Sequence, residues 1–228
     1  LDILFINKNT SLNYELKKDA LSFSSRNNKN FYKGQLDFKP FYLSANFNYE
    51  GASFKNLFDN DSILTDLVYS EILNNENLSA NINFQIKDIT NISELNDLNL
   101  NISIEEGNIN LSDSTIMWKN DLKVIFSESF LKTDDGINLI GTILIIFNDI
   151  EDFYRSFQIK KKDRKKIKQI EIDYIYNFNT KNISFDNPRV NDAQNNDLEK
   201  FINIFNSKKD RNFNKITFKN FINTFFKV

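Results

Sequence analysis

Apolar and polar residues alternate strictly over long stretches of this chain. In Leu78–Ile86 every even position is apolar and every odd position is polar. An alternation with a period of two places the apolar side chains on one face of a β-strand and the polar side chains on the other. The same pattern predicts about ten strands, over residues 12–16, 34–38, 41–49, 78–86, 98–104, 109–111, 122–126, 137–148, 170–178 and 183–185.

Short polar links between these strands indicate antiparallel neighbours. They occur at residues 27–30, 105–108 and 133–136, and the last two contain glycine. One strand differs from the rest, because Ile137–Asn148 carries apolar residues on both faces. We therefore expect an additional element, most simply a helix, to cover its outer side.

A period near 3.6 replaces the alternation in a few segments and predicts amphipathic helices. It marks a helical excursion over about 53–74, a short helix over 150–157, and a helical C-terminal end over about 196–226. No proline- or glycine-rich linker divides the chain. The expected fold is mainly β: one domain over 1–228, in which a long antiparallel sheet curls into a trough or half-barrel and carries a few helices.

Composition removes most catalytic chemistry. The chain of 228 residues has no cysteine and no histidine, which excludes thiol nucleophiles, zinc sites built on those ligands and imidazole acid–base catalysis. Glycine loops of the nucleotide-binding type are absent, and the paired acids at 105–106, 134–135 and 151–152 sit at turns or helix starts. No apolar run approaches the ~20 residues of a membrane span. We expect a protein that is not an enzyme and that needs no metal or cofactor.

The densest charge lies between the two-sided strand and the strand that begins at residue 170. Seven of the nine residues from 160 to 168 are basic, against one acid, Asp163. One interpretation is contact with an anionic surface such as lipid headgroups; the other is a solvated loop. Nucleic acid is not expected, because the run lacks aromatic residues and the net charge of the chain is −2. The candidate contact residues are Lys160, Lys161, Lys162, Arg164, Lys165, Lys166 and Lys168.

A long sheet with one apolar face must hide that face from water. Three short helices cannot cover ten strands, so the sheet either closes on itself around a filled core or holds an apolar ligand. For the second case the candidate lining residues of a lipid groove are Leu78, Ala80, Ile82, Phe84, Leu98, Leu100, Ile102, Ile104, Val124, Phe126, Ile143, Ile145, Phe147, Ile172, Tyr174 and Tyr176.

The order of these elements resembles a known family. An alternating strand at 78–86 is followed by a segment, 98–111, that is broken at Glu106-Gly107. Then, over 129–142, a strand ends, an acidic turn with glycine follows, and an apolar strand resumes through a second glycine. This arrangement, over about residues 40–190, is similar to the AsmA-like C-terminal region of bacterial envelope proteins of the AsmA, TamB and YhdP group. The chain departs from that group in having few glycines and in its lysine-rich loop.

The resemblance implies a periplasmic domain, anchored to the inner membrane by a segment outside this sequence, with a part in outer-membrane biogenesis. It implies a partner that is a phospholipid or another acyl-chain lipid, conducted or held in an apolar β-groove, and other envelope proteins as further partners. The alternative is a structural or interaction β-domain of a cell-envelope or surface protein, with a self-filled core and a partner on its asparagine-rich outer face.

Overall fold

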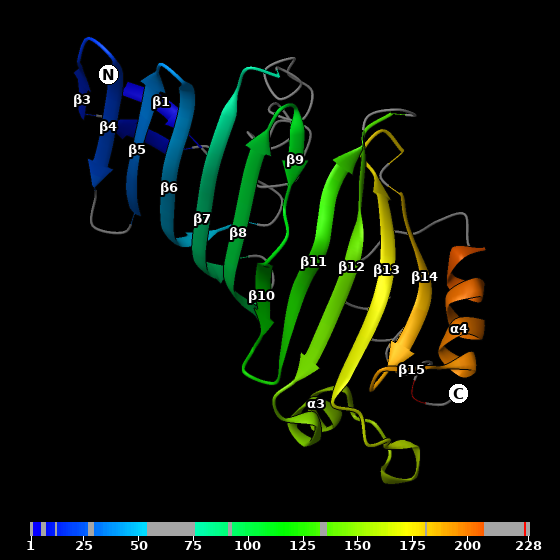
Figure 1. Cartoon of the computed structure of the whole chain (residues 1–228). Helices are drawn as coiled ribbons and strands as arrows, with labels where there is room; N and C mark the ends of the chain where they lie inside the picture. The colour runs from blue at the N-terminus through cyan, green and yellow to red at the C-terminus, as the bar shows by residue number, and fades with distance from the viewer. Residues whose placement is uncertain are drawn as a thin grey trace. The chain divides into compact units, whose positions relative to one another are not determined.

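The computed structural model describes residues 2–5, 8–11, 13–26, 30–53, 76–90, 93–132, 136–180, 182–207 and 226. The chain divides into two compact units, residues 1–116 and 117–228. Strands dominate both, and the second unit also carries helices (Figure 1). The predicted fold class is confirmed: the protein is mainly β, its strands are mostly antiparallel, and one helix lies near its C-terminal end. The single domain over 1–228 stays a prediction.

The first unit is a sheet of long strands in sequential order. A separate two-stranded sheet precedes it, formed by β1 (Asp2–Phe5) and β2 (Lys8–Ser11). The main strands are β3 (Asn13–Leu16), β4 (Ala20–Arg26), β5 (Asn30–Phe38), β6 (Phe41–Ala52), β7 (Ser79–Ile89), β8 (Leu95–Glu105) and β9 (Asn108–Asn110). The next strand, β10 (Ser114–Trp118), runs across the boundary between the two units.

One pair of neighbours in the first unit is parallel, where the alternation had predicted antiparallel pairing. β6 and β7 run in the same direction, with Ala45 opposite Ile82 and Phe47 opposite Phe84. Parallel neighbours need a long crossover connection and cannot be joined by a tight turn. The chain between these two strands is indeed long. The helix predicted over 53–74 falls almost entirely on residues 54–75, which lie outside the described residues.

The second unit contains an antiparallel meander in sequential order. Its strands are β11 (Leu122–Lys132), β12 (Asn138–Phe147), β13 (Gln169–Asn177), β14 (Asn182–Val190) and β15 (Ala193–Gln194). The register of β11 shifts between Ser127 and Phe130, and Glu128 there has a φ of 48°. This β-bulge lets β11 continue past the residue at which the sequence pattern had ended it.

Two α-helices lie in the described part of the second unit. α3 (Ile150–Phe157) begins at the end of β12, where the Asp149 side chain accepts hydrogen bonds from the backbone N–H groups of Glu151 and Asp152. The 3-10 turn η1 (Lys161–Asp163) follows it. α4 (Asn196–Asn206) is capped by Asn195 in the same way. The helices predicted at 150–157 and at the start of 196–226 are confirmed, whereas residues 208–225 lie outside the described part of the chain.

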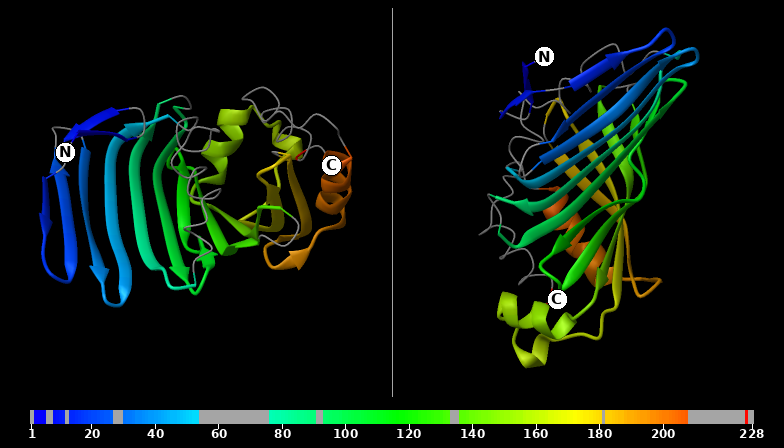
Figure 2. Two further views of the ribbon diagram at one scale, coloured as in Figure 1. Left: turned by 90° about the horizontal axis from the view of Figure 1, so that it is seen from above. Right: turned by 90° about the vertical axis from the view of Figure 1, so that its left-hand side faces the viewer.

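The sequence predicted that a helix covers the outer side of Ile137–Asn148, and for both described α-helices this prediction is wrong. Their buried residues join a cluster in which Ile145 and Phe147 take part, and these two side chains lie on the other face of β12. Figure 2 shows α3 at the end of the strands where β12 finishes. All ten residues of β12, on both faces, are half-buried.

α4 also closes an edge of its sheet. The Asn206 side-chain amide donates to the Phe185 carbonyl oxygen at 2.7 Å and accepts from the Phe185 N–H at 3.2 Å. An amide side chain in this position makes the two bonds that a further strand would make with β14.

Candidate functional site

The apolar face of the first unit is enclosed in the structure. Eight predicted lining residues lie on β7, β8 or just before them, and their exposed fractions range from 1% to 7%. Cross-strand pairs such as Ile82–Ile102 and Phe84–Leu100 follow the predicted alternation. The Phe84 ring stacks on Phe47 with 4.8 Å between centroids, and Phe84 is 2% exposed. These side chains form a filled core. The buried residues are Leu78, Ala80, Ile82, Phe84, Leu98, Leu100, Ile102 and Ile104.

The apolar face of the second unit differs in exposure. The other eight predicted lining residues share one face of β11, β12 and β13, as the registers Phe126–Ile143 and Ile143–Ile172 show. Only Tyr174 among them is buried, whereas seven are half-buried: Val124, Phe126, Ile143, Ile145, Phe147, Ile172 and Tyr176. Half-buried apolar side chains along a whole strand leave apolar surface open to a ligand or partner.

The two described helices, α3 and α4, cover one end of this face. A hydrophobic cluster joins Phe153 and Phe157 of α3 to Phe201 and Ile202 of α4. Phe147 meets Phe153 edge-on at 5.2 Å between ring centroids. Two residues further along the face, Phe126 and Ile143, are not among the described members of this cluster. We call these two residues the uncovered end, because neither α3 nor α4 covers them.

A buried polar contact lies beside the uncovered end. The Tyr174 hydroxyl donates to Ser129 Oγ at 3.0 Å, and Ser129 Oγ donates to the Ser127 carbonyl oxygen at 3.0 Å. Burial raises the pKa of Tyr174, so its phenol stays protonated over the physiological range. Gly141 leaves room for the Ser129 side chain, because a Cβ at Gly141 would stand 2.4 Å from Ser129 Oγ. The contact fixes the β-bulge of β11 against β12 and β13.

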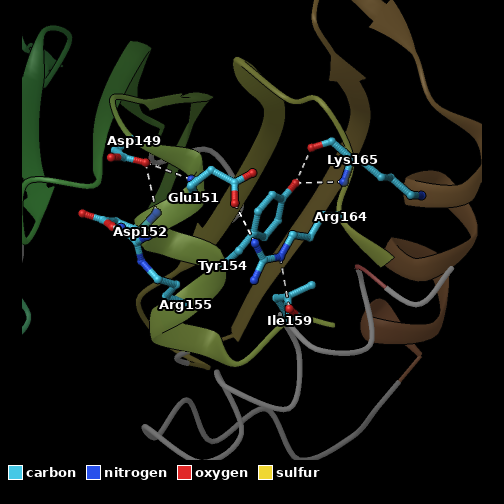
Figure 3. A network of polar contacts seen from close by, with 8 residues as sticks. All are labelled: Asp149, Glu151, Asp152, Tyr154, Arg155, Ile159, Arg164 and Lys165. Carbon is cyan, nitrogen blue, oxygen red and sulfur yellow. Dashed lines mark hydrogen bonds and ion pairs between the residues drawn. The ribbon is translucent and has the colours of Figure 1, made fainter. Parts of the chain in front are cut away.

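The lysine-rich loop, residues 160–168, is held by a network of polar contacts (Figure 3). The Tyr154 hydroxyl on α3 donates to the Lys165 carbonyl oxygen and accepts from the Lys165 N–H at 3.0 Å. The Asn191 side chain accepts from the Lys168 N–H at 2.8 Å and donates to the Lys166 carbonyl oxygen at 3.0 Å. Buried Ile159 and Ile167 anchor the two ends of the loop. The loop is therefore built into the fold.

Arg164 differs from the six lysines of this loop. Its guanidinium pairs with Glu151 at 2.6 Å, donates from Nε to the Ile159 carbonyl oxygen and lies 5.4 Å from the centre of the Tyr154 ring. Arg164 is half-buried, so its charge is used within the protein. The six exposed residues are Lys160, Lys161, Lys162, Lys165, Lys166 and Lys168. Sequence reasoning did not find Tyr154 or Asn191, whose positions relative to the loop depend on the path of the backbone.

A polar hollow on the first unit was not predicted as a site. It has a volume of about 370 Å³, and asparagine and serine side chains line most of it. Asn83 Nδ2 donates to the side-chain oxygens of Asn99 and Asn101, each at 2.6 Å. These residues occupy the polar positions of the alternating sequence pattern, and that pattern is the signal from which the hollow could have been predicted.

Two of the three acidic pairs, 105–106 and 151–152, have structural positions, and the pair at 134–135 lies outside the described residues. Glu106 and Gly107 both have positive φ in the turn after β8, and Asp152 on α3 pairs with Arg155. Within the described part of the chain, no group of three or more acidic side chains could hold a metal ion. No described helix is long and apolar enough to cross a membrane.

Comparisons with protein-family models, curated proteins and solved structures found no match to this chain.

Proposed function

We propose that this chain is a non-enzymatic β-domain that holds phospholipid acyl chains against the apolar face of its second unit. The observation that carries the proposal is the half-buried state of β12, in which the apolar side chains on this face, Leu139, Ile143, Ile145 and Phe147, all keep water-accessible surface. An acyl chain on this face would remove that surface from water, at about 25 cal/mol per Å².

The dimensions of the face suit such a ligand. Beyond the helical cluster, this face of β12 extends from Leu139 to Ile143, over five residues that span about 14 Å at the rise of a β-strand. One leaflet of a bilayer has a hydrocarbon thickness of about 15 Å. An acyl chain of about that length would therefore lie along the strands, over the part of the face that α3 and α4 leave.

The biological setting is part of the same proposal. The element order that resembles the AsmA-like region supports a periplasmic domain in outer-membrane biogenesis, tethered to the inner membrane by a segment outside this sequence. Phospholipid and other envelope proteins would be its partners.

One observation favours a second candidate function. The eight lining residues of the first unit are almost fully enclosed, and Phe84 is 2% exposed. A filled core of this kind supports a structural or interaction domain of a cell-envelope protein, with the asparagine-rich polar face as its contact surface.

Native mass spectrometry separates the two candidates. The purified chain is incubated with vesicles of phosphatidylethanolamine and phosphatidylglycerol, then recovered and weighed intact. Bound phospholipid near one per chain is expected for the acyl-chain proposal. A protein that takes up no phospholipid would refute it and favour the structural domain.

Two substitutions locate the lipid. Ile143→Asn places an amide in the uncovered end, and Ile143→Trp keeps the face apolar but fills more of it; both are expected to lower occupancy at least about tenfold. Ile175→Asn is the matched control, because Ile175 is 45% exposed on the opposite face of the same sheet. The fluorescence of Trp118, which is the only tryptophan of the natural chain, verifies that the two asparagine variants are folded, and circular dichroism verifies this for Ile143→Trp. Equal loss in Ile175→Asn would remove the assignment to this face.

A further inference from the structure

The lysine-rich loop carries positive charge that the described residues around it do not neutralise. Glu151 is paired with Arg164, Asp152 with Arg155, and Asp149 is occupied by the N–H groups of α3. Among described residues, none of the six lysine ammonium groups forms an ion pair. Six lysines against Asp163 leave a surplus of five positive charges on the loop.

The backbone that carries these lysines is fixed before any partner arrives. Both chain ends of the loop are anchored by buried isoleucines, and Tyr154 and Asn191 each make hydrogen bonds to its backbone. Fixing a loop in advance lowers the conformational entropy that binding must remove. A merely solvated loop would need no such contacts.

We propose that the lysine-rich loop is a docking surface for anionic phospholipid headgroups at a membrane surface. Headgroups at a bilayer surface require positive point charges close together on a protruding segment, without a defined pattern of donors. Single-stranded nucleic acid is recognised through aromatic side chains that stack on bases, and the loop has none. The chain as a whole is slightly acidic, so the positive potential is local to this loop.

The position of the loop gives the contact a direction. The Phe147 N–H at the end of β12 donates to the Lys168 carbonyl oxygen at 2.9 Å, and β13 begins at Gln169. The loop thus lies where β12 ends and β13 starts. Docking would turn this end of both strands toward the bilayer. The inference goes beyond the proposed function, since surface contact does not require that the apolar face hold lipid.

Vesicle sedimentation tests the contact. The whole chain is mixed with vesicles of phosphatidylcholine alone, or of phosphatidylcholine with phosphatidylglycerol, and the bound fraction gives a partition coefficient. Binding to the anionic vesicles only, weakening as salt is added, is the expected result. In the variant with Lys161→Gln, Lys162→Gln, Lys165→Gln and Lys166→Gln, each lost charge should lower the partition coefficient about fivefold.

A control variant has the same change in net charge elsewhere. Lys18, Lys33, Lys39 and Lys87 are exposed lysines of the first unit, and their replacement by glutamine should lower the partition coefficient less than about twofold. Equal losses in the two variants would overturn the proposal, because binding would then follow net charge alone. So would equal binding to both kinds of vesicle.

A labelled oligonucleotide is the competitor. If it binds more tightly than the anionic vesicles and displaces them, nucleic acid is the partner and the proposal is wrong. The mass-spectrometric uptake of phospholipid is a separate measurement. If no phospholipid is taken up, the acyl-chain function is refuted and the docking proposal is unaffected. If the vesicle experiment fails, the docking proposal is refuted and the acyl-chain function is unaffected.

Discussion

Removing one hydroxyl group from α3 should loosen the lysine-rich loop. Tyr154 is fully buried, and its phenol oxygen is both a donor to the Lys165 carbonyl and an acceptor from the Lys165 N–H. Tyr154→Phe keeps the ring, so its packing on Phe153 and Phe226 is retained. Two hydrogen bonds at about 1 kcal/mol each give an expected loss of about 2 kcal/mol in the free energy of unfolding.

Urea denaturation followed by Trp118 fluorescence measures this loss. Trp118 packs against Phe157 of α3 with 5.6 Å between ring centroids, so it reports on the cluster that includes Tyr154. For a denaturant slope of about 2 kcal/mol per M, the midpoint should fall by about 1 M. Hydrogen exchange at the Lys165 amide should also become faster. The matched control is Tyr14→Phe, since Tyr14 is 64% exposed and the change there should cost less than about 0.5 kcal/mol.

An unchanged midpoint together with unchanged exchange at Lys165 would refute this reasoning, because the hydroxyl would then hold nothing in place. The variant retains every charge of the loop. A drop in vesicle binding by Tyr154→Phe would therefore measure the value of a preformed loop separately from its charge.

Two further predictions concern the sheets. Gly141→Ala should lower the free energy of unfolding by about 1–3 kcal/mol, because the new Cβ would stand 2.7 Å from Ser129 Cα. Gly51→Ala is the control. The atom nearest to its new Cβ would be 3.4 Å away, so this change should be nearly neutral in the same urea assay. The second concerns alkaline pH. Burial raises the pKa of Tyr49, Tyr154 and Tyr174, so above about pH 10 the unfolded chain loses these protons first. The free energy of unfolding should be unaffected by them below about pH 10 and should then fall by about 1.4 kcal/mol per pH unit for each tyrosine. Denaturation at a series of pH values checks this, and an unchanged alkaline slope in Tyr174→Phe would contradict it.

Strict alternation predicted the long strands of this protein well. β7 and β8 lie where Leu78–Ile86 and Leu98–Ile104 placed them, with the even positions buried. β4 was missed because its segment is rich in serine, which is read as a turn, although Ser25 lies buried within the sheet. The parallel pairing of β6 with β7 was also missed, since a two-residue period identifies faces and not strand direction.

The candidate sites were predictable only in part. Charge density identified the lysine-rich loop, but the pairing of Arg164 with Glu151 depends on how α3 turns back toward the loop. Membership of the apolar face followed from the alternation in both units. Its exposure did not, because the enclosed residues of β7 and the half-buried Ile172 and Tyr176 of β13 both come from alternating segments.

The amide of Asn206 protects part of a strand edge in the second unit. An unpaired strand edge is a template on which another chain can add a strand, and repetition of that step leads to fibres. β15 pairs with Arg189 and Val190, and Asn206 occupies the backbone groups of Phe185 further along the same edge. At Phe185 a single side chain thus makes the two backbone hydrogen bonds that a paired strand would make, without presenting a new edge in its place. Resistance to self-association is in this way coupled to the docking of α4.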